Sequence, residues 1–260
     1  MTVNGNDTLN YNARLLSRTI GLGTVTVYDD WLKNASNPLY FGDQVTYKQI
    51  KLSFLIKDND DNSAFRDISN LVAQLKKCTI KFDDMDFLYD CVIQEAGEPT
   101  KSISDGRFKL DVTLKAAYAY LPEVSQTYDL TFSSSKDDSV DLNVQGNIPT
   151  PISVDIKVVS SPDSDTLNFK FNVDPNANTT EWIKNGFILR SIELGDTATV
   201  DSEKYLVYEA LTFIPINVFG HLWGDFVSLQ PGANTIPVGL EALDNTAEIE
   251  LTIRYKPRFI

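Results

Sequence analysis

Acidic side chains at alternate positions are the first residues of this sequence that could do chemistry. In DNDDN, Asp58, Asp60 and Asn62 have the one-three-five spacing of an EF-hand calcium loop. The sixth position of such a loop is normally Gly and the twelfth a bidentate Glu, but Ser63 and Ser69 stand there. We therefore interpret the run as a solvated helix cap and expect no metal site.

The two cysteines lie in a segment with the pattern of a hairpin. In CTIKFDDMDFLYDC, a tight turn at residues 84–85 places Phe82 opposite Phe87 and Cys78 opposite Cys91. Directly opposed cysteines are close enough to be bridged in some strand pairings. Because the sequence starts without the pattern of a signal peptide, we expect a reducing compartment and favour two thiols over a disulfide.

His221 is the only histidine, which leaves little material for catalysis. In FGHLWGDF it lies next to Trp223 in a possible sugar contact, and Trp31 and Trp182 are candidates for stacking on sugar rings. An exposed loop histidine and core or interface tryptophans are the more frequent cases. The sequence has no nucleophile elbow, Walker loop or dinucleotide-binding glycine pattern. We therefore expect no catalytic, cofactor-binding or metal-binding residues.

The composition is that of an ordinary globular chain, with 42% hydrophobic and 23% charged residues in 260. No stretch approaches the roughly 18 consecutive apolar residues of a membrane-spanning helix, and we expect no membrane partner. Without a secretory route the sequon Asn178-Thr179-Thr180 has no glycosylation role, so we interpret it as surface polarity.

The net charge is −13, with a pI near 4.5. Such a chain repels phosphates, so we expect no specific nucleic-acid binding through a basic patch. The charge is unevenly divided. Residues 1–127 include 14 basic and 17 acidic residues, a net charge of −3, whereas residues 128–260 include 9 and 19, a net charge of −10. This difference predicts two domains in different surroundings.

Short segments of alternating hydrophobicity, separated by turn residues, predict a mainly β chain with antiparallel sheets. VTYKQIKLSFLI alternates and then becomes apolar on both faces, which predicts a buried central strand. Its residues Phe54 and Ile56 are candidates for either the core or an interface. The polar segment YLPEVSQTYD, Tyr120–Asp129, has the composition of a connection, and the predicted domains are residues 1–127 and 128–260.

One segment, DNSAFRDISNLVAQLKK, has a helical period instead. Its apolar positions are Phe65, Ile68, Leu71, Val72 and Leu75. Residues 60–63 offer oxygens for the N-cap, and Lys76 and Lys77 place positive charge at the C-terminal end of the helix dipole. We therefore expect one amphipathic helix, packed against the sheet by its apolar face.

The stretch LQPGANTIPV has the residues of a sharp turn. Pro231 fixes φ, Gly232 can take a positive φ, and Asn234 can hydrogen-bond its own backbone. These features predict a turn into a strand at Thr235–Val238. We interpret the stretch as a corner and not as a site.

The order of these segments resembles the distal tail (Dit) proteins of siphophages, the long-tailed phages, that infect Gram-positive bacteria. The N-terminal segments that carry the resemblance are YNARLLSRTIGLG, YKQIKLSFLI, FRDISNLVAQLKK, CTIKFDDMDFLYDCVI and GRFKLDVTLKAAYAYLPE. The C-terminal ones are GNIPTPISVDIKV, LGDTATVDSEKYLVY, DFVSLQPGANTIPV and AEIELTIRYKPRFI. The resemblance covers the whole chain.

This resemblance implies a structural virion protein and not an enzyme. Residues 1–127 would be an N-terminal domain that forms a hexameric ring, and residues 128–260 a galectin-like β-sandwich outside it. The ring would join the tail tube protein to the tail-tip protein (the tail-associated lysin) and to receptor-binding or baseplate proteins, at the distal end of the tail, after assembly in the host cytoplasm. Since the chain is acidic, we expect carboxylates in the channel that let the genome pass without sticking.

Two other functions stay open at the level of sequence. One is a soluble carbohydrate-binding β-sandwich protein, although no Arg or Asn accompanies His221 in the spacing of galectin sugar sites. The other is a glycosidase, which needs only two carboxylates at the right separation. Among 36 acidic residues, the sequence gives no reason to choose a pair.

Overall fold

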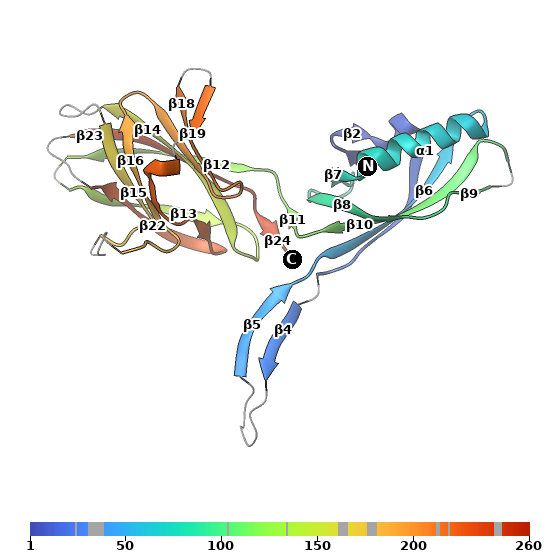
Figure 1. The fold of residues 1–260 in the computed structure, drawn as a ribbon, viewed down its shortest axis with the longest axis horizontal. Coiled ribbons are helices and arrows are strands. Elements are labelled where there is room, and N and C mark those ends of the chain that lie inside the picture. The colour runs from blue at the N-terminus through green and yellow to red at the C-terminus, as the bar shows by residue number, and fades with distance from the viewer. Residues whose placement is uncertain are drawn as a thin grey trace. The chain divides into compact units, whose positions relative to one another are not determined.

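The computed structural model describes residues 1–23, 25–30, 39–102, 104–133, 135–160, 166–175, 181–211, 214–217, 219–241 and 246–260. Strands dominate it, as Figure 1 shows, and the prediction of a mainly β fold is confirmed. The chain forms two compact units. Unit 1 contains Met1–Leu121 with Phe259–Ile260, and unit 2 contains Pro122–Arg258.

Unit 1 is built on an antiparallel sheet. Its strand order is β2 (Asn6–Asp7), β1 (Thr2–Val3), β7 (Lys77–Lys81), β8 (Leu88–Ala96), β10 (Arg107–Ala116), β6 (Lys48–Lys57) and β3 (Ala13–Ile20). The short strands β9 (Thr100–Lys101), β11 (Ala119–Tyr120) and β24 (Arg258–Phe259) lie beside this path, and the 3₁₀ turn η1 (Thr8–Tyr11) leads into β3. β6 lies between β10 and β3, which confirms the predicted central strand.

The sheet packs one face against α1 (Asp61–Leu75), in which Ile68, Leu71 and Leu75 are buried. The predicted helix is therefore confirmed. It ends two residues earlier than the segment suggested, because Lys77 begins β7. Phe65 is half exposed and lies at the rim of this core, with its ring 4.8 Å from that of Phe108. Within the described residues, no helix has the length and apolar character needed to cross a membrane.

Alternation in β6 decides which residues enter this core. Ile50, Leu52, Phe54 and Ile56 point to the helix side and are almost fully buried, so Phe54 and Ile56 belong to the core and not to an interface. The intervening Lys51 points to the opposite face and is exposed.

Two further strands extend unit 1 beyond this sheet. β4 (Val25–Asp30) follows β3 in the chain, and β5 (Leu39–Val45) precedes β6. The two pair with each other in a separate two-stranded sheet, with a register shift between Tyr28 and Asp29 (Figure 1). β4 and β5 therefore form an arm that is inserted in the chain between β3 and β6, the two strands at one edge of the main sheet.

Unit 2 is a β-sandwich. One sheet has the order β12 (Val124–Phe132), β23 (Ala247–Tyr255), β14 (Thr150–Ser160), β17 (Thr197–Asp201), β18 (Leu206–Leu211) and β19 (Ile214–Asn217), with β21 (Ser228–Leu229) beside β14. The other has the order β13 (Asp137–Val144), β22 (Gly232–Leu240), β15 (Thr166–Phe171), β16 (Phe187–Glu193) and β20 (Leu222–Gly224), which follows η2 (Phe219–His221). A single core of apolar side chains from both sheets lies between them.

The segment expected to connect the domains is largely a strand. β12 pairs along its whole length with β23, from Val124 opposite Tyr255 to Phe132 opposite Ala247. The prediction of a polar connection over Tyr120–Asp129 was therefore wrong for most of its length. The division between the units falls at Leu121 and Pro122, because β12 belongs to the sandwich.

The predicted corner at residues 229–238 is confirmed. Gly232 has φ +99°, and the side-chain amide of Asn234 donates to the carbonyls of Gln230 and Gly232 at 2.9 and 2.8 Å. The strand that follows is longer than the predicted Thr235–Val238, because β22 already pairs with β13 from Gly232 onward.

Gly106 fixes the turn before β10 onto the start of α1. Its amide donates to the Asp61 carboxylate at 2.8 Å, its carbonyl accepts from the Asp58 amide at 2.9 Å, and its φ is +69°. A Cβ there would lie 2.1 Å from the Asp58 carbonyl oxygen, whereas at Gly5 (φ +80°) a Cβ would meet nothing within 4 Å.

We expect Gly106→Ala to lower the free energy of unfolding of unit 1 by about 3 kcal/mol, through left-handed strain plus a forced backbone shift. Gly5→Ala, with the strain alone, is the matched control and should cost about 1 kcal/mol. The loss of unfolding free energy in each variant is measured by denaturant unfolding, monitored through hydrogen exchange of the α1 amides. Equal costs would show that the contact with Asp58 is unimportant.

Candidate assembly surfaces

The acidic run before α1 works as a helix cap. The Asp60 carboxylate accepts from the Ser63 amide at 2.9 Å and from the Ser63 hydroxyl at 3.0 Å, and these bonds lower the pKa of Asp60. Asp58 accepts from the neighbouring Asn59 amide. Among the residues that the structure describes, no group of three or more His, Cys, Asp or Glu side chains is arranged to hold a metal ion.

Two of the tryptophans that were sugar-site candidates contact each other in unit 2. The rings of Trp182 and Trp223 lie 5.4 Å apart at 63°, and the Trp182 indole N–H donates to Asp225 at 2.9 Å. His221 is exposed at the end of η2. The third tryptophan, Trp31, and the sequon at 178–180 lie outside the described residues.

The cysteines are cross-strand neighbours, as predicted. Cys78 in β7 lies directly opposite Cys91 in β8, and both are buried free thiols. Burial, with a smaller effect of Asp90, raises the pKa of Cys78 to about 11. Burial also raises the pKa of Cys91, with Cys78 and Asp90 adding to the effect. Neither thiol is therefore prepared to act as a nucleophile.

The edge of the unit 1 sheet is open at β3. Within the described residues β3 pairs with β6 alone, with a register shift at Leu16, between Leu15 and Ser17. Leu16 of β3 is 52% exposed, and two more leucines are exposed in the segments that flank the strand, Leu9 (60%) in η1 before it and Leu22 (79%) after it. A long open edge with exposed leucines is unfavourable for a monomer and favourable for association with another chain.

Arg18 holds this edge strand to the turn between β7 and β8. Its guanidinium makes two 2.6 Å bonds to the Asp84 carboxylate and lies 4.3 Å from the centre of the Phe82 ring. The bond to Asp84 raises the pKa of Arg18, and the reciprocal bond lowers that of Asp84. The amino group of Met1 binds the adjacent Asp83 at 2.7 Å. The edge is thus braced in one position.

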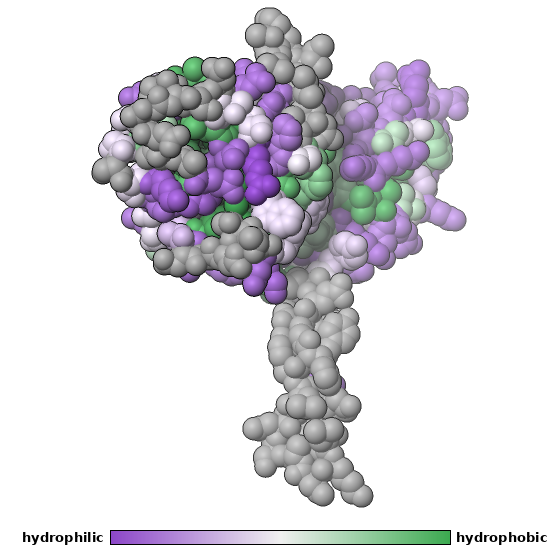
Figure 2. All heavy atoms as spheres, turned by 60° about the vertical axis from the view of Figure 1, so that its left-hand side comes forward, coloured by the Kyte–Doolittle hydropathy of each residue, from purple (hydrophilic) through white to green (hydrophobic). Residues whose placement is uncertain are grey.

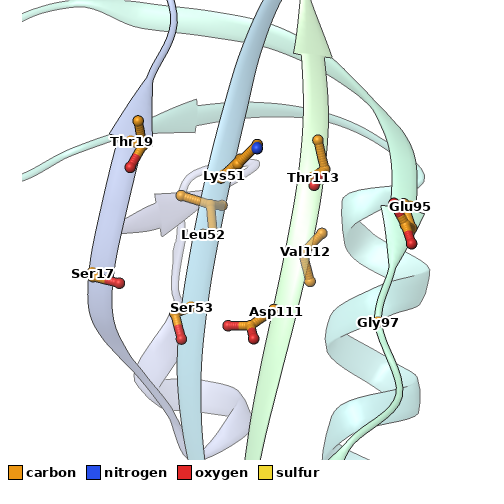
Figure 3. Close-up of a pocket in the computed structure, with 10 residues that line it drawn as sticks. All are labelled: Ser17, Thr19, Lys51, Leu52, Ser53, Glu95, Gly97, Asp111, Val112 and Thr113. Atoms are coloured by element: carbon orange, nitrogen blue, oxygen red, sulfur yellow. The ribbon is translucent and has the colours of Figure 1, made fainter.

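The sheet face opposite α1 is polar and rich in basic residues. β3, β6 and β10 contain eight basic residues and one acidic residue, Asp111. Register and exposure place six of the basic residues on this face: Arg14, Lys51, Lys57, Arg107, Lys109 and Lys115. The other two, Arg18 and Lys48, point to the opposite side. Figure 3 shows side chains from β3, β6 and β10 next to one another on this face.

The sequence matches no protein-family model and no curated protein. The fold does match solved structures. The Dit (gp 19.1) protein of phage SPP1, described as a paradigm of the hub adsorption apparatus in phages infecting Gram-positive bacteria, has a TM-score of 0.66 at 13% identity, over 99% of this chain and 98% of that chain. The chain shares the Dit fold.

Two further matches come from the phage P2 baseplate in its activated conformation. The structure with Ca has a TM-score of 0.56 at 10% identity, and the structure with Sr has 0.54 at 12%. Each match covers 98% of this chain and 94% of that chain. The resemblance predicted from the sequence is therefore confirmed for the fold, across both units.

We expect the two thiols to resist alkylation in the folded protein. With a pKa of about 11, roughly one Cys78 in 1,000 is thiolate at pH 8, against about one in four for a free cysteine. Iodoacetamide labelling at pH 8, followed by mass spectrometry, should be at least ~100-fold slower than in guanidinium chloride. Its rate should rise with pH. Fast labelling of the folded chain at pH 8 would contradict the burial of this pair.

Proposed function

We propose that the chain is a distal tail hub of a phage virion. In this proposal six copies form a ring that joins the tail tube to the tail-tip protein and to receptor-binding or baseplate proteins, and the genome passes through its channel. The observation that carries the proposal is the match to the SPP1 Dit protein over 99% of one chain and 98% of the other. The role is structural and includes no catalytic step or cofactor.

Unit 1 has the features that a ring requires. A ring needs two different surfaces on each copy, so that every subunit joins the next in the same way. The braced edge of β3, with Leu16 exposed on it and Leu9 and Leu22 exposed in the flanking segments, supplies one such surface. A neighbouring copy that covers it would satisfy the open backbone groups of β3 and remove the leucines from water.

Unit 2 has a different surface for partners, and we assign it the outer position. Tyr205 is 69% exposed and Phe219 52%, and both rings lie against Phe226, at 5.2 and 6.1 Å between centroids. Figure 2 shows apolar residues (green) between hydrophilic ones (purple) on the visible face of this unit. Exposed aromatic groups of this kind are typical of protein contacts, here with baseplate or receptor-binding proteins.

A carbohydrate-binding sandwich is the second candidate function, and the exposed Trp182 is the observation that favours it. Its indole N–H is already bound to Asp225 and its ring packs against Trp223, which weakens this candidate. If the protein has this function, it should be a monomer that binds glycans on an array. The Trp182→Ala variant should lose this binding.

Light scattering after size-exclusion chromatography tests the hub proposal. A hexamer has a mass of about 175 kDa, six times 29.1 kDa, and negative-stain images should show rings with a central hole. If the protein alone is monomeric, the same measurement is repeated with the tail tube and tail-tip proteins from the same phage. A monomer that stays unassembled with both partners would overturn the proposal.

Replacing the exposed leucines of the edge should break the ring. We expect Leu16→Lys with Leu22→Lys to shift the mass to that of the monomer, because charged edges oppose strand pairing and each buried Leu contributes roughly 1.5–3 kcal/mol. The matched control is Val159→Lys with Leu206→Lys, two exposed apolar residues of unit 2. Circular dichroism checks the fold of both variants. Intact rings in the edge variant would exclude this surface as the ring interface.

A further inference from the structure

The charge on the open face of the unit 1 sheet has the opposite sign to that of the chain. The net charge of the chain is −13, yet six of the seven charged side chains that β3, β6 and β10 place on this face are basic. The exception, Asp111, is paired with Lys109 at 3.1 Å, and the neighbouring Ser53 hydroxyl and this pair lower the pKa of Asp111. Lys109 therefore partly offsets the one carboxylate that these three strands place on the face.

Hydroxyl groups lie near one of these basic residues, Lys51. A shallow hollow of about 360 Å³ on this face is lined by side chains of the three strands and of the segment around β8. Ser17, Thr19, Ser53 and Thr113 contribute hydroxyls to this hollow, which Lys51, Asp111 and Glu95 also line (Figure 3). Lysine, serine and threonine side chains are the usual partners of nucleic-acid phosphates.

We propose that this open basic face binds the phosphate backbone of duplex DNA. The surface is an antiparallel sheet with short side chains between the lysines, so it offers charge and hydroxyls but no element that could enter a groove and read base edges. Contacts of this kind are independent of sequence and sensitive to salt. They would hold a duplex loosely enough to slide, which is what a channel for a genome requires.

The wider face sets a limit on the strength of this contact. β8 adds Glu95 and Asp90, and β7 adds Lys77 and Lys81, so the basic surplus is greatest over β3, β6 and β10. Binding is therefore expected in the non-specific range of about 10⁻⁴–10⁻⁶ M. The inference rests on the proposed hub function, and it reverses our expectation of a carboxylate-lined channel if this face lines it.

Fluorescence anisotropy of a labelled 25-bp duplex, titrated with the full-length protein at about 50 mM salt and then at rising salt, tests the inference. We expect Lys51→Gln, Lys109→Gln and Lys115→Gln together to weaken binding at least about tenfold and to reduce the salt slope by about 2.7. The matched control is Arg66→Gln, Lys136→Gln and Lys184→Gln, three exposed basic residues elsewhere, which should leave both values near those of the unmodified protein.

The mass of each sample is measured by light scattering in the same buffers. Rings that bind no DNA, or that bind equally well in both variants, would overturn the inference and leave the hub proposal standing. We call the variant with Lys51, Lys109 and Lys115 replaced the Lys51 set. If the protein is monomeric and only the Lys51 set loses DNA binding, the result would support the face as a DNA surface and count against the ring. A change of mass in the Lys51 set, with DNA affinity unchanged, would mean that the face contacts protein instead, and would also overturn the inference.

Discussion

The packing of one helix against one face of the unit 1 sheet is the constraint on which the rest of that unit depends. α1 buries Ile68, Leu71 and Leu75 against the sheet, and the period of two in β6 supplies Leu52 and Phe54 to meet them. The same period sends Lys51 to the other face. Because a strand cannot bury one row of side chains without presenting the other, the core and the open polar face are two results of one alternation.

Unit 1 has one uncovered sheet face and one uncovered sheet edge because it has few elements to cover them. One helix covers one side, and the strand order ends at β3, where the backbone has no described partner besides β6. The edge carries Arg14 and a register shift at Leu16, yet Leu16 itself is exposed there, and Arg18 and Asp84 hold the edge in place. A braced and apolar edge is what a surface needs if another copy is to bind it without first ordering it.

Local features of the fold could be predicted from the sequence, and features that depend on distant partners could not. The helix, the Cys78–Cys91 pairing and the turn at Gly232 each depend on residues close in the chain. β12 was missed because its pairing partner, β23, lies more than a hundred residues away and its own side chains are mostly polar. The bond between Arg18 and Asp84 was missed for the same reason, since 66 residues separate them.

The net charge of the chain does not give the sign of the charge on any one face of the molecule. A total of −13 is a sum over every face of the molecule, and it led us to expect no phosphate contact. Alternation in β6 and β10 sorts the charges by side, and the register brings Lys51, Lys109 and Lys115 onto one face from strands that are 50 residues or more apart in the chain. The field that an approaching phosphate meets is set mainly by charges within about 10 Å, so the sign of that face, and not of the chain, decides whether contact is favourable.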